Sequence, residues 1–444
     1  MAPQQNCDIK LNADTECQDD SNSVMEGAQS VNTIMAIGGV IGPGYFMGMG
    51  TGLSTAGPAG LLICFAVVGC LLWLVMQSLG ELASFLAVSG SFTHYSARFI
   101  DPAWGFVLSW NYFLLWTGII MAEYTSAIFM SFALLGVWAF GEAEFWLALT
   151  KILCIAAFFL CAILISSGVI GNRKIGVFQI FVFAALQYSG TEMIGLTAGE
   201  SRNPSKDIPT AVRSIIWRIL IIFLWGDLLP YHHPASPFVI AFVRAGAAAG
   251  ANAINAIILV SIFSAVNSAL YVGSRTLYGL AKEGAAPRVF LRTLPNGIPI
   301  VALVTFHLFG FLSLLNLSSD AGKVYTWVTT MTGVATFITC SSICLCYIRM
   351  RSAMRLQSTP SSILPYQAAF WPYGAYMGFG ISVFFIFFQG WTAFAPWDVQ
   401  SFFMNYIIVL VIVLLFVGWK VWHWTEWVRL DTADLVSGRR TWLM

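Results

Sequence analysis

Charged residues are scarce in this chain of 444 amino acids. Asp, Glu, Lys and Arg make up only 10% of it, whereas soluble proteins carry about a quarter. Hydrophobic residues make up 58%, and the mean hydropathy is +0.76. This balance excludes an ordinary soluble domain. The net charge is only +1, and no basic stripe with interleaved aromatic residues occurs, so we expect no nucleic-acid partner.

The chain also lacks the sequence patterns of enzymes and metal sites. Its nine cysteines are scattered, and none forms a CxxC pair with matching histidines. The sequence has no nucleophile–base pair and no phosphate loop. The glycine-rich stretch GGVIGPG at 38–44 does not follow a strand, as a dinucleotide fingerprint would. We therefore expect no enzymatic activity, no metal site and no cofactor.

Long apolar runs occupy most of the chain and predict an all-α integral membrane protein. Residues 1–30 are polar, without the apolar core of a signal peptide, and predict a disordered cytosolic tail. Residues 31–425 form the predicted transmembrane domain, and 426–444 a cytosolic C-terminal tail. Eleven segments are predicted to span the membrane: 32–53, 59–86, 104–140, 145–168, 177–199, 214–229, 250–280, 299–317, 324–348, 373–394 and 402–424.

Lys and Arg gather in alternate connections, which the positive-inside rule assigns to the cytosol. Four such clusters lie at 202–218, 282–292, 349–355 and 420–440. Arg98 suggests that the connection before residue 104 is cytosolic too, yet three predicted spans separate it from Arg202, where an even number is required. Either the 104–140 run crosses twice as a cramped hairpin, or a helix is missing there, or a single arginine is poor topological evidence. We favour the missing or truncated helix.

Two predicted spans contain residues that interrupt a helix. GGVIGPG at 38–44 combines four glycines with a proline, which disfavour a helix interior. YSGTEMIG at 188–195 places a carboxylate inside an apolar run, where ionisable residues are expensive. The alternatives are a glycine face for helix packing and a glutamate near the end of a span. Paired interrupted helices favour a transporter built from inverted repeats with a midplane site.

Several sequence blocks form an ordered series between about residues 31 and 440. They are AIGGVIGPGYFMGMG (36–50), AGPAGLL (56–62), MQSLGELA (76–83), VSGSFTHYSARFIDPAWGF (88–106), GEAEFWLALTKIL (141–153), YSGTEMIGLTAGESRNPSKDIPTA (188–211), ASPFVIAFVRAG (235–246), INAIILVSIFSAVNSALYVGSRTLYGLAKEGAAP (254–287) and DLVSGRR (434–440). As a set, they resemble the fungal amino acid permeases of the amino acid–polyamine–organocation superfamily. The family's fourth helix precedes the GEAEFW block, where this chain has only SFALLGVWAF (131–140).

The resemblance implies the inverted five-helix repeat fold, with 11–12 transmembrane helices, helices 1 and 6 unwound, and helix 4 missing or truncated here. The unwound part of helix 1 would present amides to the substrate carboxylate, and that of helix 6 carbonyls to the ammonium. Pro43 would remove one amide donor. The substrate-binding candidates are Gly39, Ile41, Gly42, Pro43, Gly44, Tyr188, Ser189, Gly190, Thr191, Ser264 and Asn267.

Three ionisable residues are candidates for proton coupling: Glu123, Lys151 and Glu192. Glu123 matches the family's intramembrane acid of helix 3, and Lys151 matches a lysine of helix 5 that points at the first break. A structural carboxylate and a lysine reaching toward a span end are the alternatives. Helix–helix hydrogen bonding is the alternative for Ser264 and Asn267.

The resemblance implies a multi-pass plasma membrane protein with both termini in the cytosol, which imports amino acids by proton-coupled symport and alternating access. Amino acids, protons and the lipid bilayer are its expected partners. The alternatives are a non-transporting remnant or mis-spliced gene model of such a permease, and an amino acid sensor on the same fold. A sensor would need a longer cytosolic tail than these thirty residues, which argues against it.

Overall fold

The computed structural model describes residues 49–88, 90–123, 177–198, 203–213, 248–295, 297–312, 321–394, 397–437 and 439. Within these ranges the regular elements are helices, accompanied by one isolated bridge between Phe394 and Trp397. The fold class is therefore α-helical, as predicted. Two of the expected spans, 145–168 and 214–229, lie outside the described residues.

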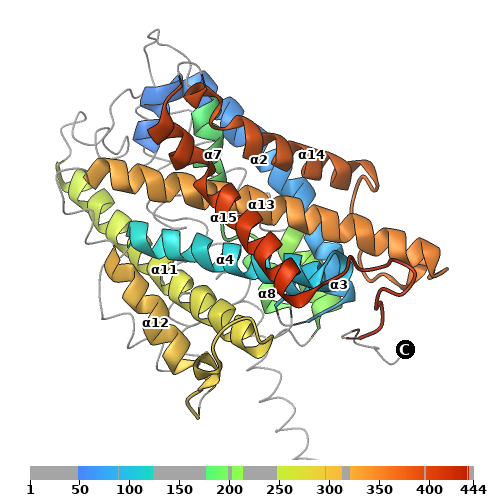
Figure 1. Ribbon diagram of the computed structural model, residues 1–444. Helices are drawn as coiled ribbons and strands as arrows, with labels where there is room; N and C mark the ends of the chain where they lie inside the picture. Colours follow the sequence, from blue (N-terminus) through green and yellow to red (C-terminus); the bar gives the residue numbers. More distant parts are fainter. Residues whose placement is uncertain are drawn as a thin grey trace, which may run out of the picture.

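Long helices make up the body of the molecule (Figure 1). Short 3₁₀ turns connect some of them: η2 (Arg288–Leu291), η4 (Ser361–Ile363) and η5 (Trp391–Ala393). The α-helices are α2 (Met49–Phe85), α3 (Phe92–Phe99), α4 (Pro102–Glu123), α7 (Val177–Tyr188), α8 (Met193–Thr197), α11 (Ala248–Lys282), α12 (Ile300–Gly310), α13 (Ala321–Leu356), α14 (Tyr373–Phe388) and α15 (Val399–His423).

Four stretches of the described helices are long and apolar enough to cross a membrane. They are Ala59–Phe85, Pro102–Met121, Trp327–Leu356 and Val399–His423, and α12 and α14 are shorter apolar helices. The window in α13 is 89% buried inside the protein, whereas that in α15 is only 17% buried. Helix α13 is thus the central element, and α15 lies at the periphery, where lipid would cover its exposed side chains.

Helix α13 crosses the molecule between two groups of helices (Figure 1). It packs against α4, α14, α7, α2 and α15, while α11 packs against α4 and α12. The approach of α13 to α7 depends on Gly333, where a Cβ would lie 2.5 Å from the Val182 carbonyl oxygen. Small residues of this kind let helix backbones approach closely in membranes.

The sequence of α15 shows how local chemistry defines one span. Asp398 precedes the helix and accepts hydrogen bonds from the Gln400 amide (3.1 Å) and the Ser401 hydroxyl (2.5 Å), which caps the N-terminus. Lys420 lies in the last turn, where a cation suits the helix dipole. Its ammonium pairs with the buried Asp101 carboxylate. The helix is therefore anchored at both ends by polar contacts, with an apolar run between them.

The connection before residue 104 and the ends of α11, α13 and α15 lie on one side of the molecule. His94 Nδ1 is 3.9 Å from the Glu283 carboxylate beyond α11, and Arg349 of α13 donates to the Phe99 carbonyl. Lys420 of α15 pairs with Asp101. Four of the five base-bearing segments therefore share one face of the protein. The fifth segment, 202–218, also approaches this side. The guanidinium carbon of Arg213 lies 5.7 Å from the centre of the Tyr366 ring, in the connection that follows α13.

The C-terminal segment after α15 folds back onto this same side. The Val428 amide donates to the Ile100 carbonyl (2.9 Å), and Arg98 pairs with Asp434 (2.9 Å). Burial alone would raise the pKa of Asp434, but hydrogen bonds from Ser437 and Val436, together with Arg98, hold that pKa well below its usual range. The described part of the predicted tail is thus docked on the helices.

Some helix boundaries differ from the predictions. The sequence separated the first two spans at residues 54–58, but α2 runs without interruption from Met49 to Phe85. The predicted boundary is wrong because Pro58 lies inside a helix that tolerates it. Helix α13 also continues beyond the predicted end at residue 348 to Leu356. Its arginines therefore belong to the helix rather than to a loop.

Candidate functional site

The second predicted interruption coincides with a break between α7 and α8. Helix α7 ends at Tyr188, residues 189–192 form turns, and α8 begins at Met193. Gly190 has a φ of +104°, a conformation that residues with a Cβ rarely adopt. The chain can therefore turn here without a strained side-chain-bearing residue.

The Glu192 carboxylate folds back onto this break. It accepts the Gly190 amide through both oxygens, at 3.2 Å and 3.0 Å, while the Thr191 hydroxyl donates to the Tyr188 carbonyl at 3.3 Å. Glu192 is only 5% exposed. Because an ionised carboxylate is costly to bury, the Gly190 amide helps to stabilise it. The break therefore holds a buried acid that is bonded to the backbone of the turn itself.

Helices α2, α4 and α13 surround the break. The Tyr188 hydroxyl donates to the Phe65 carbonyl of α2 at 3.3 Å. Tyr112 of α4 interacts electrostatically with Glu192, although its hydroxyl has no hydrogen bond of ordinary length within the described part of the chain. Cys340 of α13 also lies within electrostatic reach of Glu192. The acid thus sits where three helices meet.

A cavity of about 310 Å³ adjoins the break. Tyr112 and Met193 line its inner part, and Lys282 and Glu283 line it near the end of α11. Its walls are mostly apolar with a few polar groups, as in typical small-molecule sites. Since Glu283 contacts His94 on the side where the basic clusters gather, the cavity runs between that side and the break. It is large enough for a small amphipathic molecule.

The predicted residues of α11 are buried but stand apart from this cavity. Ser264 is 0% exposed and Asn267 is 1% exposed, and both make polar or packing contacts within the protein. Neither belongs to the lining of the cavity. Their assignment to substrate remains a prediction.

The other candidates cannot be placed. Gly39, Ile41, Gly42, Pro43, Gly44 and Lys151 lie outside the described residues. Glu123 is the last residue of α4, and its side chain is likewise outside the description. Among the predicted site residues, the described part of the chain places five consecutive ones at the break: Tyr188, Ser189, Gly190, Thr191 and Glu192.

Sequence reasoning missed a second buried acid, Glu81 of α2. Its side chain is 0% exposed and lies 2.6 Å from Arg351 Nε. Tyr347 and the Ala368 amide each donate to it at 2.7 Å. The block MQSLGELA does indicate a buried acid, because a carboxylate inside an apolar run requires a partner. That partner lies 270 residues away in the chain, which no local pattern reveals.

Comparison with known proteins identifies the family of the chain. The family model described as "Amino acid permease" matches residues 32–133 and 125–430. A general amino acid permease of Saccharomyces cerevisiae is 34% identical, covering 92% of this chain and 83% of that protein. A lysine-specific permease of Lactococcus lactis is 33% identical, covering 91% of each chain. A lysine-specific permease of Saccharomyces cerevisiae is 31% identical over an alignment of 471 positions, covering 92% of this chain and 77% of that protein.

Solved structures support the fold. A mutant of the Eremococcus coleocola manganese transporter superposes with a TM-score of 0.53 at 12% sequence identity, covering 89% of this chain and 94% of that one. At this low identity the similarity concerns the fold alone, which is that of a helical membrane transporter.

Proposed function

Because this chain belongs to the amino acid permease family, we propose that it imports amino acids across the plasma membrane as a proton-coupled symporter, by alternating access and with both termini in the cytosol. The family and its relatives carry the general assignment to amino acid transport in a membrane. The coupling ion, the membrane and the orientation are our proposals. The observation that supports them best is the buried Glu192 at the α7–α8 break, beside a cavity of about 310 Å³.

Glu192 would link the proton to the backbone of the break. When ionised, its two oxygens hold the Gly190 amide. A proton on this carboxyl would remove the charge-assisted part of that interaction and leave the turn freer to rearrange. A substrate ammonium beside the break would instead favour the ionised form. Proton and substrate would therefore act on the same short segment.

The remaining candidates would complete the site. Gly39, Ile41, Gly42, Pro43 and Gly44 would offer backbone groups to the substrate carboxylate, as half-helix ends do for anions. Glu123 and Lys151 would take part in proton transfer, and Ser264 and Asn267 would line the substrate path. The cavity between the break and the end of α11 would serve as the path on the side where the basic clusters gather.

The test is uptake into proteoliposomes that contain the purified full-length chain. We expect accumulation of labelled amino acids from a panel when an inward proton gradient is imposed, and none when the gradient is collapsed. Glu192→Gln should abolish gradient-driven accumulation while substrate exchange persists. Glu426→Gln, an exposed acid remote from the break, is the matched control. Accumulation by Glu192→Gln equal to the wild type would refute its role, and no uptake or binding by the wild type would refute transport.

A further inference from the structure

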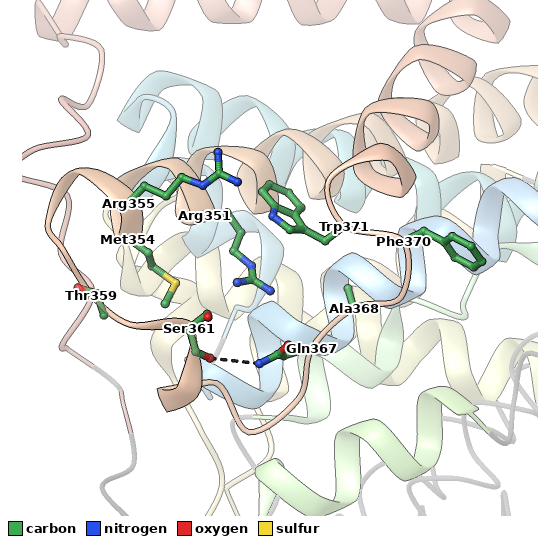
Figure 2. Close-up of a pocket in the computed structure, with 9 residues that line it drawn as sticks. All are labelled: Arg351, Met354, Arg355, Thr359, Ser361, Gln367, Ala368, Phe370 and Trp371. Carbon is green, nitrogen blue, oxygen red and sulfur yellow. Dashed lines mark hydrogen bonds between the residues drawn. The ribbon is translucent and has the colours of Figure 1, made fainter.

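A second cavity, of about 480 Å³, lies between the last turns of α13 and the connection to α14 (Figure 2). It shares no lining residue with the cavity at the α7–α8 break. Arg351 and Arg355 enter it from one face of α13, since they are four residues apart. Trp371 stands opposite, with its ring 5.3 Å and 5.9 Å from the two guanidinium carbons.

The two arginines of this cavity differ in their charge balance. Arg351 is neutralised by the buried Glu81 carboxylate, at 2.6 Å. Arg355 is exposed, and within the described ranges no carboxylate lies within 4.0 Å of its guanidinium. Its positive charge therefore faces the cavity uncompensated. A guanidinium in this state offers paired N–H donors that match a phosphate.

Capping of α13 does not account for Arg355. The chain leaves the helix through Ser358, whose φ is +54°. The Ser358 amide donates to the Arg355 carbonyl (3.2 Å) and the Thr359 amide to the Met354 carbonyl (2.8 Å). This pattern satisfies the terminal carbonyls with backbone donors alone. The side chain of Arg355 is therefore available for another partner.

Hydroxyl groups supplement the charge. Thr359 and Ser361 line the cavity, and among the described residues neither hydroxyl has a hydrogen-bond partner. The Gln367 amide donates to the Ser361 carbonyl at 3.3 Å, which ties the two sides of the loop together (Figure 2). The cavity thus combines one free cation with two free hydroxyl donors.

The position of the cavity indicates what kind of anion enters it. Helix α14 starts directly beyond it, and its first residues are unusually exposed for aromatic side chains: Tyr373 is 75% and Tyr376 is 55% exposed. Phe370 at the cavity itself is 69% exposed. Exposed aromatic residues at the end of a span are typical of the membrane–water interface. The cavity therefore opens at the level of lipid headgroups, on the side where basic clusters gather.

We propose that this cavity binds the headgroup of an anionic phospholipid. Arg355 would contact the phosphate through its guanidinium, and Thr359 and Ser361 would donate hydrogen bonds to the remaining phosphate oxygens. The acyl chains would follow the exposed aromatic face of α14. Basic pockets between transmembrane helices on the cytosolic side suit such headgroups.

Native mass spectrometry of the purified full-length chain tests the proposal. The protein is titrated with phosphatidylserine or with phosphatidylcholine of identical acyl chains. We expect phosphatidylserine to bind more tightly, because its headgroup is anionic, whereas the choline cation of phosphatidylcholine offsets the charge of the same phosphate. Arg355→Gln should weaken phosphatidylserine binding roughly fivefold, the loss expected for one arginine near anionic lipid. Thr359→Ala combined with Ser361→Ala should weaken it without removing charge. Arg292→Gln, an exposed arginine outside the cavity, should leave it unchanged.

Three results would overturn the proposal. The first is equal phosphatidylserine binding by the wild type and Arg355→Gln. The second is an equal loss in Arg292→Gln, which would indicate general charge attraction. The third is full displacement of the lipid by inorganic phosphate, which would identify a site for a soluble anion. Because Arg355 is exposed and its described contact is with Trp371, the variant should retain the wild-type elution profile, and this is checked first.

Discussion

The buried pair of Glu81 and Arg351 allows a quantitative prediction about stability. Glu81 is 0% exposed at its side chain and Arg351 is 10% exposed. Besides the contact at 2.6 Å, Arg351 Nη2 donates to Glu81 at 3.0 Å. Substituting Glu81→Gln would leave a buried arginine without its counter-charge, and Arg351→Met would leave a buried carboxylate with only the Tyr347 and Ala368 donors.

Breaking a buried pair in this way costs about 3–5 kcal/mol, whereas replacing both partners with uncharged groups is often nearly neutral. At about 2 °C per kcal/mol for a large chain, each single variant should lose roughly 6–10 °C in apparent Tm. The double variant should lose much less than the two single losses together. The coupling between the two residues would then exceed about 2 kcal/mol, which is large even for neighbouring residues.

Thermal denaturation in detergent, followed by tryptophan fluorescence, measures these shifts. Arg429→Gln is the control, because it breaks an ion pair with Asp431 in which the side chains are 79% and 53% exposed. Such a surface pair contributes little, so its Tm should stay within about 1 °C of the wild type. Single variants as stable as this control, or a double variant whose losses add, would refute the reasoning.

Three further predictions concern the break, the proton and the tail. Gly190→Ala should abolish uptake and destabilise the protein by about 1–3 kcal/mol, because its φ is +104°. Gly418→Ala in α15, with no atom within 4 Å of the added Cβ, should do neither, and equal behaviour of the two variants in uptake and Tm would contradict this. Glu123→Gln should retain amino acid binding but lose gradient-driven uptake, and unchanged uptake would exclude its coupling role. The pKa of Asp434 is depressed, so its contribution to tail docking is present above the unfolded pKa and is lost only as pH falls through the folded value. Asp434→Asn should therefore speed tryptic cleavage after Arg429 at neutral pH, and a wild-type cleavage rate would contradict the docking.

Sequence patterns predicted the spans well where periodicity and composition determine the helix boundaries. They predicted them poorly where a contact with a distant residue determines where a helix ends. The apolar run of α13 was recognised, but its end was predicted eight residues too early at the arginine cluster, one residue before Arg349. A loop is the ordinary location for such a cluster at a membrane edge. The helix can continue past the cluster because Arg351 forms an ion pair with Glu81 and donates a hydrogen bond to the Tyr347 hydroxyl. No pattern within α13 reports a carboxylate on α2.

The candidate site shows the same division. A glycine and a carboxylate inside an apolar run predicted the position of the α7–α8 break. The contact of Glu192 with Gly190 is local to that sequence, whereas the burial of Glu192 depends on the helices that surround the break. Tyr112 was not predicted, because nothing distinguishes one tyrosine among the aromatic residues of α4. Its role near Glu192 depends on the packing of separate helices, as does the cavity beside it.

Contacts between distant segments, as well as charge, constrain the number of membrane crossings between residues 100 and 282. Arg98 shares a face with Asp434 in the C-terminal segment, and the same connection contacts Glu283 beyond α11. An even number of crossings must therefore separate residue 100 from residue 282. The apolar runs between them number five: 104–140, 145–168, 177–199, 214–229 and 250–280.

Five is one crossing short of an even number, and the comparisons bear on where a helix is shortened. The family model matches in two pieces that overlap at residues 125–133. The alignment with the yeast lysine permease has 471 positions, more than the aligned 92% of this 444-residue chain can fill, so the relative carries residues that this chain lacks. A span requires about 20 residues, so the shortfall is large enough for one helix and its turn. The predicted truncation of the fourth helix would contribute to this shortfall, but parity still requires a sixth crossing. Residues 124–140, at 17 residues, reach the lower limit for a span. The chain thus keeps its paired halves in opposite orientations only if this short run crosses the membrane on its own.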